Sequence, residues 1–223
     1  MTFTEHIHKT YLFSDLNQDE LNQLEQHSTE VSYAKGDTIY KQGSYSTHAI
    51  YLLEGYATIY QEINVGKRIV KIIKPGWFIG LMSVFSYEKH LFSAMASEAC
   101  VVRMIEKNQI SLLIETNPKF ALKMVQELSL LGSSLVQYLV TQNTKNVRGR
   151  IAEILLHLSE NIYKSTEFEF IFTRKELGAL ANTSTETAIR IINDFKNEKI
   201  IGFNEKKIII SNIDQLKKVL ELG

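Results

Sequence analysis

The sequence predicts an α+β protein with an N-terminal antiparallel β-roll, a long central helix and a C-terminal winged helix-turn-helix. Residues 31 to 105 contain short segments rich in Ile, Val, Tyr and Thr that are separated by glycines, a pattern typical of a compact antiparallel roll. From residue 117 to 145 apolar residues recur every three or four positions, which indicates one long helix. After residue 173 two short helical patterns are joined by a brief break, which is the spacing of a helix-turn-helix.

Composition and charge are those of an ordinary globular protein, and they exclude several kinds of site. The 223 residues include 25 Lys and Arg, 25 Asp and Glu, and a single cysteine, Cys100. One cysteine excludes an internal disulfide, a four-cysteine iron-sulfur cluster and a cysteine-based structural zinc site. The N-terminus lacks a signal-peptide pattern and no stretch approaches 18 apolar residues. We therefore expect a soluble, cytoplasmic protein without a membrane partner.

A sensing domain is expected over residues 1–116, and it begins with a short amphipathic helix. Asn17, followed three residues later by Glu20, indicates the start of this helix, which continues to about His27. Cys100 lies in an apolar strand, where an inert buried thiol is the default interpretation and a redox switch is the minor one. The predicted strands are Thr38–Tyr40, Ala49–Leu53, Ala57–Tyr60, Arg68–Ile73 and a final run over Ser93–Ile105.

The long helix is predicted over residues 117–145. Asn117 is a typical cap, and Pro118 suits the first helical position because its missing N–H has no partner to lose there. Apolar residues form a heptad seam, and other apolar residues lie on further faces of the helix. We therefore expect the helix to contact both its own domain and a twin helix in a homodimer. The predicted dimer contacts are Met124, Leu128, Leu131, Leu135 and Tyr138.

The third predicted domain, residues 146–223, follows a hinge at Lys145-Asn146 and contains the helix-turn-helix. Thr173 and Glu176 form a predicted capping box, Asn182 is the expected turn residue, and Ser184 or Thr183 caps the second helix. The second helix of such a motif can enter the major groove of DNA. Two short strands around residues 204–207 form the expected wing, and a last helix is predicted over Asp214–Leu222.

Because the net charge is zero, attraction to phosphates must come from local placement of cations. The cations placed for this purpose are Arg174, Lys175, Arg190, Lys196 and Lys199.

Three segments together resemble the Crp/Fnr superfamily of bacterial transcription regulators. They are GWFIGLMSVF in the roll, NVRGRIAEILLHLS after the hinge, and FTRKELGALANTSTETAIRIINDFKNEKIIGFNEKKIII at the helix-turn-helix and wing. The resemblance implies a roll similar to a cyclic-nucleotide-binding domain, a homodimer joined along the long helix, and a winged helix bound to double-stranded DNA. It also implies RNA polymerase as a partner.

In this family the recognition helix carries a Glu followed four residues later by an Arg, and Glu186 and Arg190 match that pair. An arginine can bond guanine O6 and N7 together, whereas a glutamate accepts from cytosine N4. Many members have an Arg where this chain has Thr185, so the half-site can differ. Arg174 matches a phosphate-contacting arginine, and Ser184, Thr185 and Thr187 are placed for phosphate or supplementary base contacts. The alternative is that Glu186 and Arg190 form only an exposed ion pair.

The sensory site departs from the members that bind cyclic AMP. Those members have a glutamate after the glycine and an arginine about ten residues later, whereas this chain has Leu81 after Gly80 and Leu91 or Phe92 at the arginine position. Lys89 could supply charge but lacks the bidentate fork of arginine. A cyclic phosphate without its cation is strongly disfavoured, so the resemblance argues against cyclic AMP.

The effector remains unidentified. The predicted effector pocket, for an apolar or small polar molecule, consists of Gly80, Leu81, Met82, Ser83, His90, Leu91, Phe92 and Ser93. The absence of any ligand is the other possibility. Haem is a minor alternative, with His48 and His90 as axial candidates.

Two other classes of function have weaker support. A signalling module whose winged helix contacts protein is compatible with the near-neutral charge. An enzyme has little support, because the sequence has no HExxH motif, no phosphate-cradling glycine loop and no evident nucleophile and base. No metal site is predicted.

Overall fold

The computed structural model describes residue 7 and residues 10–223, apart from 64–65, 87, 171 and 206. The chain divides into two compact units. The first contains the residues up to Glu62 together with Val70–Ser134, and the second contains Ile63–Ile69 together with Leu135–Gly223. The expected domain borders at residues 116 and 145 stay predictions. Among the described residues, no helix combines the length and apolar character needed to cross a bilayer.

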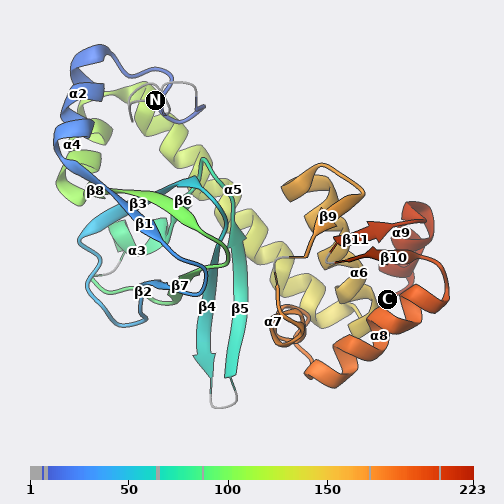
Figure 1. Cartoon of the computed structure of the whole chain (residues 1–223). Coiled ribbons are helices and arrows are strands. Elements are labelled where there is room, and N and C mark those ends of the chain that lie inside the picture. The colour runs from blue at the N-terminus through green and yellow to red at the C-terminus, as the bar shows by residue number, and fades with distance from the viewer. Residues whose placement is uncertain (1–6, 8–9, 64–65, 87, 171, 206) are drawn as a thin grey trace. The chain divides into compact units, whose positions relative to one another are not determined.

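Two four-stranded antiparallel sheets form the roll (Figure 1). One has the strand order β1-β8-β3-β6 and the other the order β2-β7-β4-β5. The first sheet consists of β1 (Ser28–Tyr33), β8 (Cys100–Glu106), β3 (His48–Glu54) and β6 (Phe78–Ile79). The second consists of β2 (Thr38–Tyr40), β7 (Ser93–Ala96), β4 (Ala57–Ile63) and β5 (Gly66–Ile73). The roll is therefore confirmed, but the final run predicted over Ser93–Ile105 is two strands, β7 and β8, which lie in different sheets.

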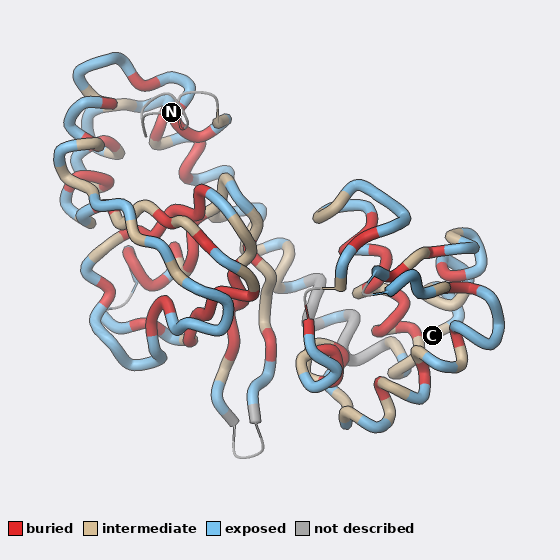
Figure 2. The backbone as a smooth tube through the Cα atoms, in the orientation of Figure 1, coloured by how far each residue is buried: buried red, intermediate tan, exposed pale blue. Residues whose placement is uncertain are grey.

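Strand β3 lies at the centre of the roll because both of its faces are covered. Ala49, Tyr51 and Leu53 pack in a cluster with residues of the helices, whereas Ile50 and Leu52 pack in a second cluster between the sheets. A strand buried on both faces reads as a continuous apolar run, and Figure 2 shows the resulting buried stretches within the roll. This double burial explains why the sequence around residue 50 does not alternate in polarity.

Short helices complete the first unit: α2 (Gln18–Gln26), α3 (Leu81–Ser86) and α4 (Lys107–Thr116). The predicted capping box of α2 is confirmed, with Asn17 accepting from the Glu20 N–H at 2.9 Å and Glu20 accepting from the Asn17 N–H at 2.8 Å. The helices α3 and α4 were not predicted. Their six and ten residues are too few for helical periodicity to stand out next to the strands.

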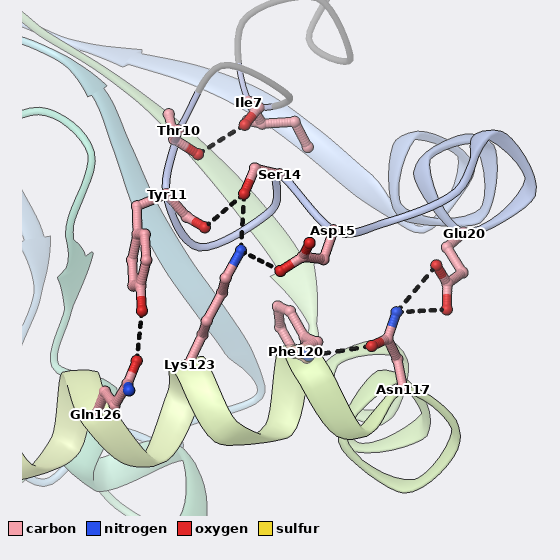
Figure 3. Close-up of polar contacts among 10 residues, drawn as sticks. All are labelled: Ile7, Thr10, Tyr11, Ser14, Asp15, Glu20, Asn117, Phe120, Lys123 and Gln126. Carbon is pink, nitrogen blue, oxygen red and sulfur yellow. Dashed lines mark hydrogen bonds and ion pairs between the residues drawn. The ribbon is translucent and has the colours of Figure 1, made fainter.

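The long helix α5 (Pro118–Thr144) begins at the predicted cap, where Asn117 accepts from the Phe120 N–H at 3.0 Å. Polar contacts tie its first turns to the N-terminal segment (Figure 3). Asn117 donates to both carboxylate oxygens of Glu20, at 3.0 and 3.2 Å. Lys123 lies 2.6 Å from the Asp15 carboxylate and donates to the Ser14 hydroxyl at 2.7 Å. These contacts fasten one side of α5 to its own domain.

After the end of α5, the second unit contains α6 (Val147–His157) and a π-helical turn, η1 (Leu158–Tyr163). The helices α7 (Arg174–Leu180) and α8 (Thr185–Asn197) follow, and α9 (Ile213–Leu222) ends the chain. The wing strands β10 (Ile201–Asn204) and β11 (Lys207–Ile210) are confirmed. A third strand, β9 (Glu167–Glu169), pairs with β11 and was not predicted. Its three residues give no periodic signal, and only the pairing with β11 defines it.

Candidate nucleic-acid interface

A close approach of backbones shapes the corner between α7 and α8. A Cβ atom at Gly178 would lie 3.1 Å from the Thr183 carbonyl oxygen and 3.2 Å from the Thr185 nitrogen. The Thr183 N–H also donates to the Gly178 carbonyl at 2.9 Å. Asn182 has a φ of 49°, as predicted for a residue type that tolerates the left-handed conformation. The absence of a side chain at Gly178 therefore sets the spacing of the two helices.

Both helices begin with the predicted caps. Thr173 accepts from the Glu176 N–H at 3.2 Å, and Glu176 accepts from the Thr173 N–H at 2.7 Å. Ser184 accepts from the Thr187 N–H at 3.1 Å, which identifies Ser184 as the cap of α8. These bonds satisfy backbone donors that otherwise lack partners at a helix start.

Helix α8 has one buried face and one exposed face. Ala188, Ile191 and Phe195 are buried in the domain. Four of the six predicted DNA-contact residues, Arg174, Ser184, Glu186 and Arg190, are exposed, whereas Thr185 and Thr187 are half-buried. Arg174 is the first residue of α7, and the other five lie at the start of α8 or in its first two turns.

The carboxylate of Glu186 stays charged and points away from the core. Hydrogen bonds from its own backbone N–H and from the Ser184 hydroxyl hold the pKa of Glu186 below its usual value. Among the ion pairs formed by the described residues, none joins Glu186 to Arg190. The alternative that Glu186 and Arg190 form only an ion pair with each other therefore has no support in the free chain. Both side chains remain available to bases in a DNA major groove.

Three further residues that were not predicted lie on the exposed face of α8 or hold the helix-turn-helix in place. Asn193 is exposed and follows Glu186 and Arg190 at the spacing of one helix face, a signal that the sequence does contain. Arg150 of α6 donates to the Ala181 carbonyl at 2.8 Å and to the Lys145 carbonyl at 2.5 Å. Gly178 is the third residue. The roles of Arg150 and Gly178 depend on contacts between elements, which no local pattern reveals.

The guanidinium of Arg148 anchors the far end of α8. It forms an ion pair with Glu198 and lies 4.6 Å from the ring centroid of Phe195. Cation–π contacts of this kind stabilise a buried aromatic face. The helix-turn-helix is thus held to α6 at two points: Arg150 bonds the end of α7 at Ala181, and Arg148 contacts the far end of α8.

The predicted effector pocket in the roll separates into an inner and an outer set of residues. Leu81, Ser83, His90 and Ser93 are buried. Met82 and Leu91 are 41% and 38% exposed, so they lie at the surface rather than in an enclosed cavity. Phe92 is partly buried against the core between the sheets. The pocket stays a prediction.

The inner residues of this pocket are already engaged with other parts of the roll. The hydroxyl of Ser93 accepts from the Gln42 N–H at 2.9 Å, and that of Ser83 accepts from the Leu91 N–H at 3.5 Å. His90 stacks on Tyr40 with ring centroids 3.7 Å apart. Leu81 stands in place of the acid, and Leu91 or Phe92 in place of the arginine, so these residues offer a cyclic phosphate no cation and do not fit a cyclic nucleotide.

Histidines in the roll differ in their surroundings. His48 lies at the start of β3 with its Nδ1 2.9 Å from the Thr47 hydroxyl. The Nδ1 of His90 is buried and has no hydrogen-bond partner, and burial lowers the pKa of this histidine. Across the described part of the chain, no group of three or more His, Cys, Asp or Glu side chains is arranged as a metal site.

The apolar surface of α5 differs from the predicted dimer seam. Met124 is 2% exposed and belongs to the core of its own domain, and Leu128 packs against that core. Leu131 and Leu135 are half-buried, and the side chain of Tyr138 lies outside the described residues. The apolar residues of α5 that are exposed are Leu122, Val125, Leu130, Val136 and Val140. Met124 is therefore committed to its own domain and cannot be a main contact to a partner helix.

Two family models match the chain. Residues 30–117 match the cyclic nucleotide-binding domain, and residues 149–219 match the Crp-like helix-turn-helix domain. The first match contains most of the roll, and the second contains α7, α8 and the wing.

Curated relatives with similar sequences are transcription regulators. The transcriptional regulatory protein btr of Bordetella pertussis is 29% identical over 154 residues, which are 66% of this chain and 62% of that protein. The match thus spans less than two thirds of that relative. The cAMP-activated global transcriptional regulator CRP of Salmonella typhimurium is 25% identical over 190 residues, which are 80% of this chain and 87% of that protein.

Solved structures share the fold. FixK2 from Bradyrhizobium japonicum superposes with a TM-score of 0.79 at 20% identity, covering 86% of this chain and 96% of FixK2. A CRP/FNR family transcriptional regulator from Thermus thermophilus superposes with a TM-score of 0.71 at 23% identity, covering 86% of this chain and 98% of that one.

Proposed function

The chain belongs to the Crp/Fnr superfamily of DNA-binding transcription regulators, and we propose that it acts as a homodimer that reads a pseudo-palindromic DNA site. The observation that carries the proposal is the exposed face of α8, on which Glu186 and Arg190 lie one turn apart without pairing to each other. In this proposal Arg190 reads a guanine through O6 and N7, and Glu186 accepts from the N4 of a cytosine.

The surrounding polar residues supply positioning contacts. Arg174 at the start of α7 is proposed to contact a phosphate, as are Ser184, Thr185 and Thr187 around the start of α8. Asn193 lies further along the exposed face of α8 and is added to this set. Thr185 stands where many family members have an arginine, so we expect a half-site that differs from theirs at the position this residue faces.

Dimerisation is proposed along α5, with a seam different from the one predicted from the sequence. Leu122, Val125 and Val136 are 60%, 58% and 62% exposed, and their spacing, with Ser129, Gly132 and Ser133 between them, follows one face of the helix. Small residues in the middle of this seam permit close packing of two helices. Two recognition helices related by a two-fold axis would then meet half-sites one helical turn apart.

Regulation is proposed to act through the roll, and RNA polymerase is the proposed protein partner. An effector in the roll would act only if its affinity differed between two arrangements of the dimer. A cyclic nucleotide is a poor effector candidate, because the roll has no arginine at the position that would pair with the cyclic phosphate. A winged helix that contacts protein remains the alternative function.

The experiment that tests the proposal measures binding to selected DNA sites by fluorescence anisotropy. We expect Glu186→Ala and Arg190→Ala to lose about 1 to 3 kcal/mol of base discrimination. The DNA affinity of Arg190→Lys should keep most of its dependence on salt, because the positive charge remains. Its preference for guanine should be lost, because lysine lacks the two parallel N–H donors of the guanidinium group. Lys218→Ala, which removes an exposed charge on α9, is the matched control and should bind as the wild type does.

A salt titration separates the two candidate functions. Binding to DNA through several phosphates must weaken steeply as salt rises. If Glu186→Ala and Arg190→Ala both keep the affinity and sequence preference of the wild type, the assignment of these residues is wrong. Weak, salt-insensitive binding to all DNA would favour a winged helix that contacts protein.

A further inference from the structure

The backbone of Gly80, at the junction of β6 and α3, lies directly against a tyrosine ring. Gly80 has a φ of +72°, and a Cβ atom at this position would lie 2.9 Å from Cζ of Tyr40 and closer still to its hydroxyl. A side chain at position 80 would force the phenol of Tyr40 to shift, and the positive φ favours glycine here in any case. Tyr40 comes from β2, which belongs to the other sheet of the roll.

His90 also lies against this phenol ring. The imidazole stacks on it, with 3.7 Å between ring centroids and 14° between planes. Backbone bonds fix this histidine: its N–H donates to the Ser44 carbonyl and its carbonyl accepts from the Gly43 N–H, both at 2.8 Å. Both Tyr40 and His90 are at least nine-tenths buried. The phenol of Tyr40 is therefore in contact with both the Gly80 backbone and the His90 ring.

The phenol of Tyr40 occupies space beside the predicted effector pocket. Gly80, Leu81, His90 and Ser93 belong to that pocket, and Tyr40 does not. The ring of Tyr40 also packs in the cluster between the two sheets, which includes Ile79. An aromatic side chain of the protein itself thus lies against the pocket residues that a ligand in the roll would contact.

We propose that Tyr40 is an internal plug: its ring occupies the space beside Gly80 and His90 at the border of the predicted effector pocket, and this makes the folded roll independent of cyclic nucleotides. This inference rests on the proposed function, because it takes the roll to be the regulatory domain. Removal of the phenol should leave a cavity lined by the Gly80 backbone, the His90 ring and apolar side chains. A cavity of this kind accepts a small aromatic molecule of the same shape.

The test uses the full chain and thermal unfolding, with p-cresol as the probe because it has the shape of the tyrosine side chain. Tyr40→Ala should lower the melting temperature by about 5 to 10 °C, since a large buried ring is lost. Excess p-cresol should then raise the melting temperature of Tyr40→Ala by about 3 °C. It should leave the wild type and Tyr45→Ala unchanged, because Tyr45 is 67% exposed and its loss opens no cavity.

Cyclic AMP and cyclic GMP at millimolar concentration should not change the melting temperature of the wild type. A rise with either nucleotide would overturn the proposal, as would equal stabilisation of the wild type and Tyr40→Ala by p-cresol. If Tyr40→Ala does not fold, Tyr40→Leu takes its place with the same expected response. None of these measurements involves DNA. A wrong assignment of Tyr40 can therefore be distinguished from a wrong assignment of the DNA-contact residues.

Discussion

Cys100 shows how burial determines the chemistry of a single side chain. The thiol is 1% exposed, and burial raises its pKa to about 11. The thiolate is the reactive form. A shift from 9.0 to about 11 lowers the thiolate fraction about 100-fold near neutral pH. This supports the inert thiol over the redox switch.

We therefore expect native Cys100 to react with a thiol reagent such as DTNB at least about 100-fold more slowly than the unfolded chain does at the same pH. The measurement is the absorbance of the coloured thiolate that the reagent releases, with and without denaturant. Reaction of the native protein at the rate of the unfolded chain would contradict the buried position of this thiol.

His90 makes the stability of the roll depend on pH. Burial lowers the pKa of His90 in the folded state, so between that pKa and the unfolded value near 6.5 the unfolded chain binds more protons. The free energy of unfolding should therefore fall as the pH drops below about 6.5, by at most about 1.4 kcal/mol per pH unit from this group.

His90→Phe is the variant that isolates this effect, since phenylalanine keeps a ring beside Tyr40 and cannot titrate. Denaturant unfolding between about pH 7 and pH 5, the range that spans the unfolded histidine pKa, should show a shallower loss of stability in His90→Phe than in the wild type. Identical slopes would mean that His90 is protonated equally in both states.

The packing of α7 against α8 depends on a close contact at Gly178. A side chain at Gly178 would meet three backbone atoms at 3.1 to 3.3 Å, from Thr183, Ser184 and Thr185. Backbone at this distance cannot move without changing the turn. The angle between the two helices is therefore sensitive to the volume at position 178.

Gly178→Val should destabilise the second unit by about 1 to 3 kcal/mol, the usual cost of overpacking, and should also weaken DNA binding because α8 is displaced. Ala179→Val is the control, since it places the same side chain on the next residue of α7. Denaturant unfolding and anisotropy measure the two effects. If both variants behave alike, the cost comes from helix propensity rather than from the turn.

For helix α5, periodicity identified the helix but not which of its faces packs against the roll. Its length and its cap at Asn117 follow from the sequence, because caps and heptads are local signals. Apolar residues lie on several faces, however, and either face could have met the roll. The structure buries Phe120 and Met124 in the roll, which leaves Leu122, Val125 and Val136 exposed.

For the whole molecule, the exposed face of α5 predicts the oligomeric state. Val125→Asp should convert a dimer of the 25.6 kDa chain into a monomer, because a charge would be buried within the seam. DNA affinity should fall at least about 10-fold, since only one half-site can then be bound at a time.

Light scattering measures the mass, and anisotropy measures the affinity. Leu112→Asp on α4 is the control, since Leu112 is also exposed, at 49%, but lies off the proposed seam. A Val125→Asp protein that remains dimeric would place the dimer contact elsewhere.

The sequence by itself determined the kinds of elements and the superfamily. Caps at Asn17, Asn117, Thr173 and Ser184, together with periodicity and glycine corners, depend on neighbours within a few residues, so they can be identified without the fold. The pair Glu186 and Arg190 was assigned from the resemblance to the recognition helix of the superfamily, and its spacing of four residues places both side chains on one helix face.

Only the tertiary structure decided which surfaces are available. Residues 40, 80 and 90 meet because two sheets bring β2, the start of α3 and the segment around His90 together, and no local spacing encodes that contact. Arg150 likewise reaches the Ala181 carbonyl 31 residues away, and Met124 is buried by a core that forms around it. Helix caps and helical periodicity depend on backbone geometry over one or two turns, so the sequence reveals them. The contacts of Tyr40, Met124 and Arg150 depend on packing between distant segments, so only the tertiary structure reveals them.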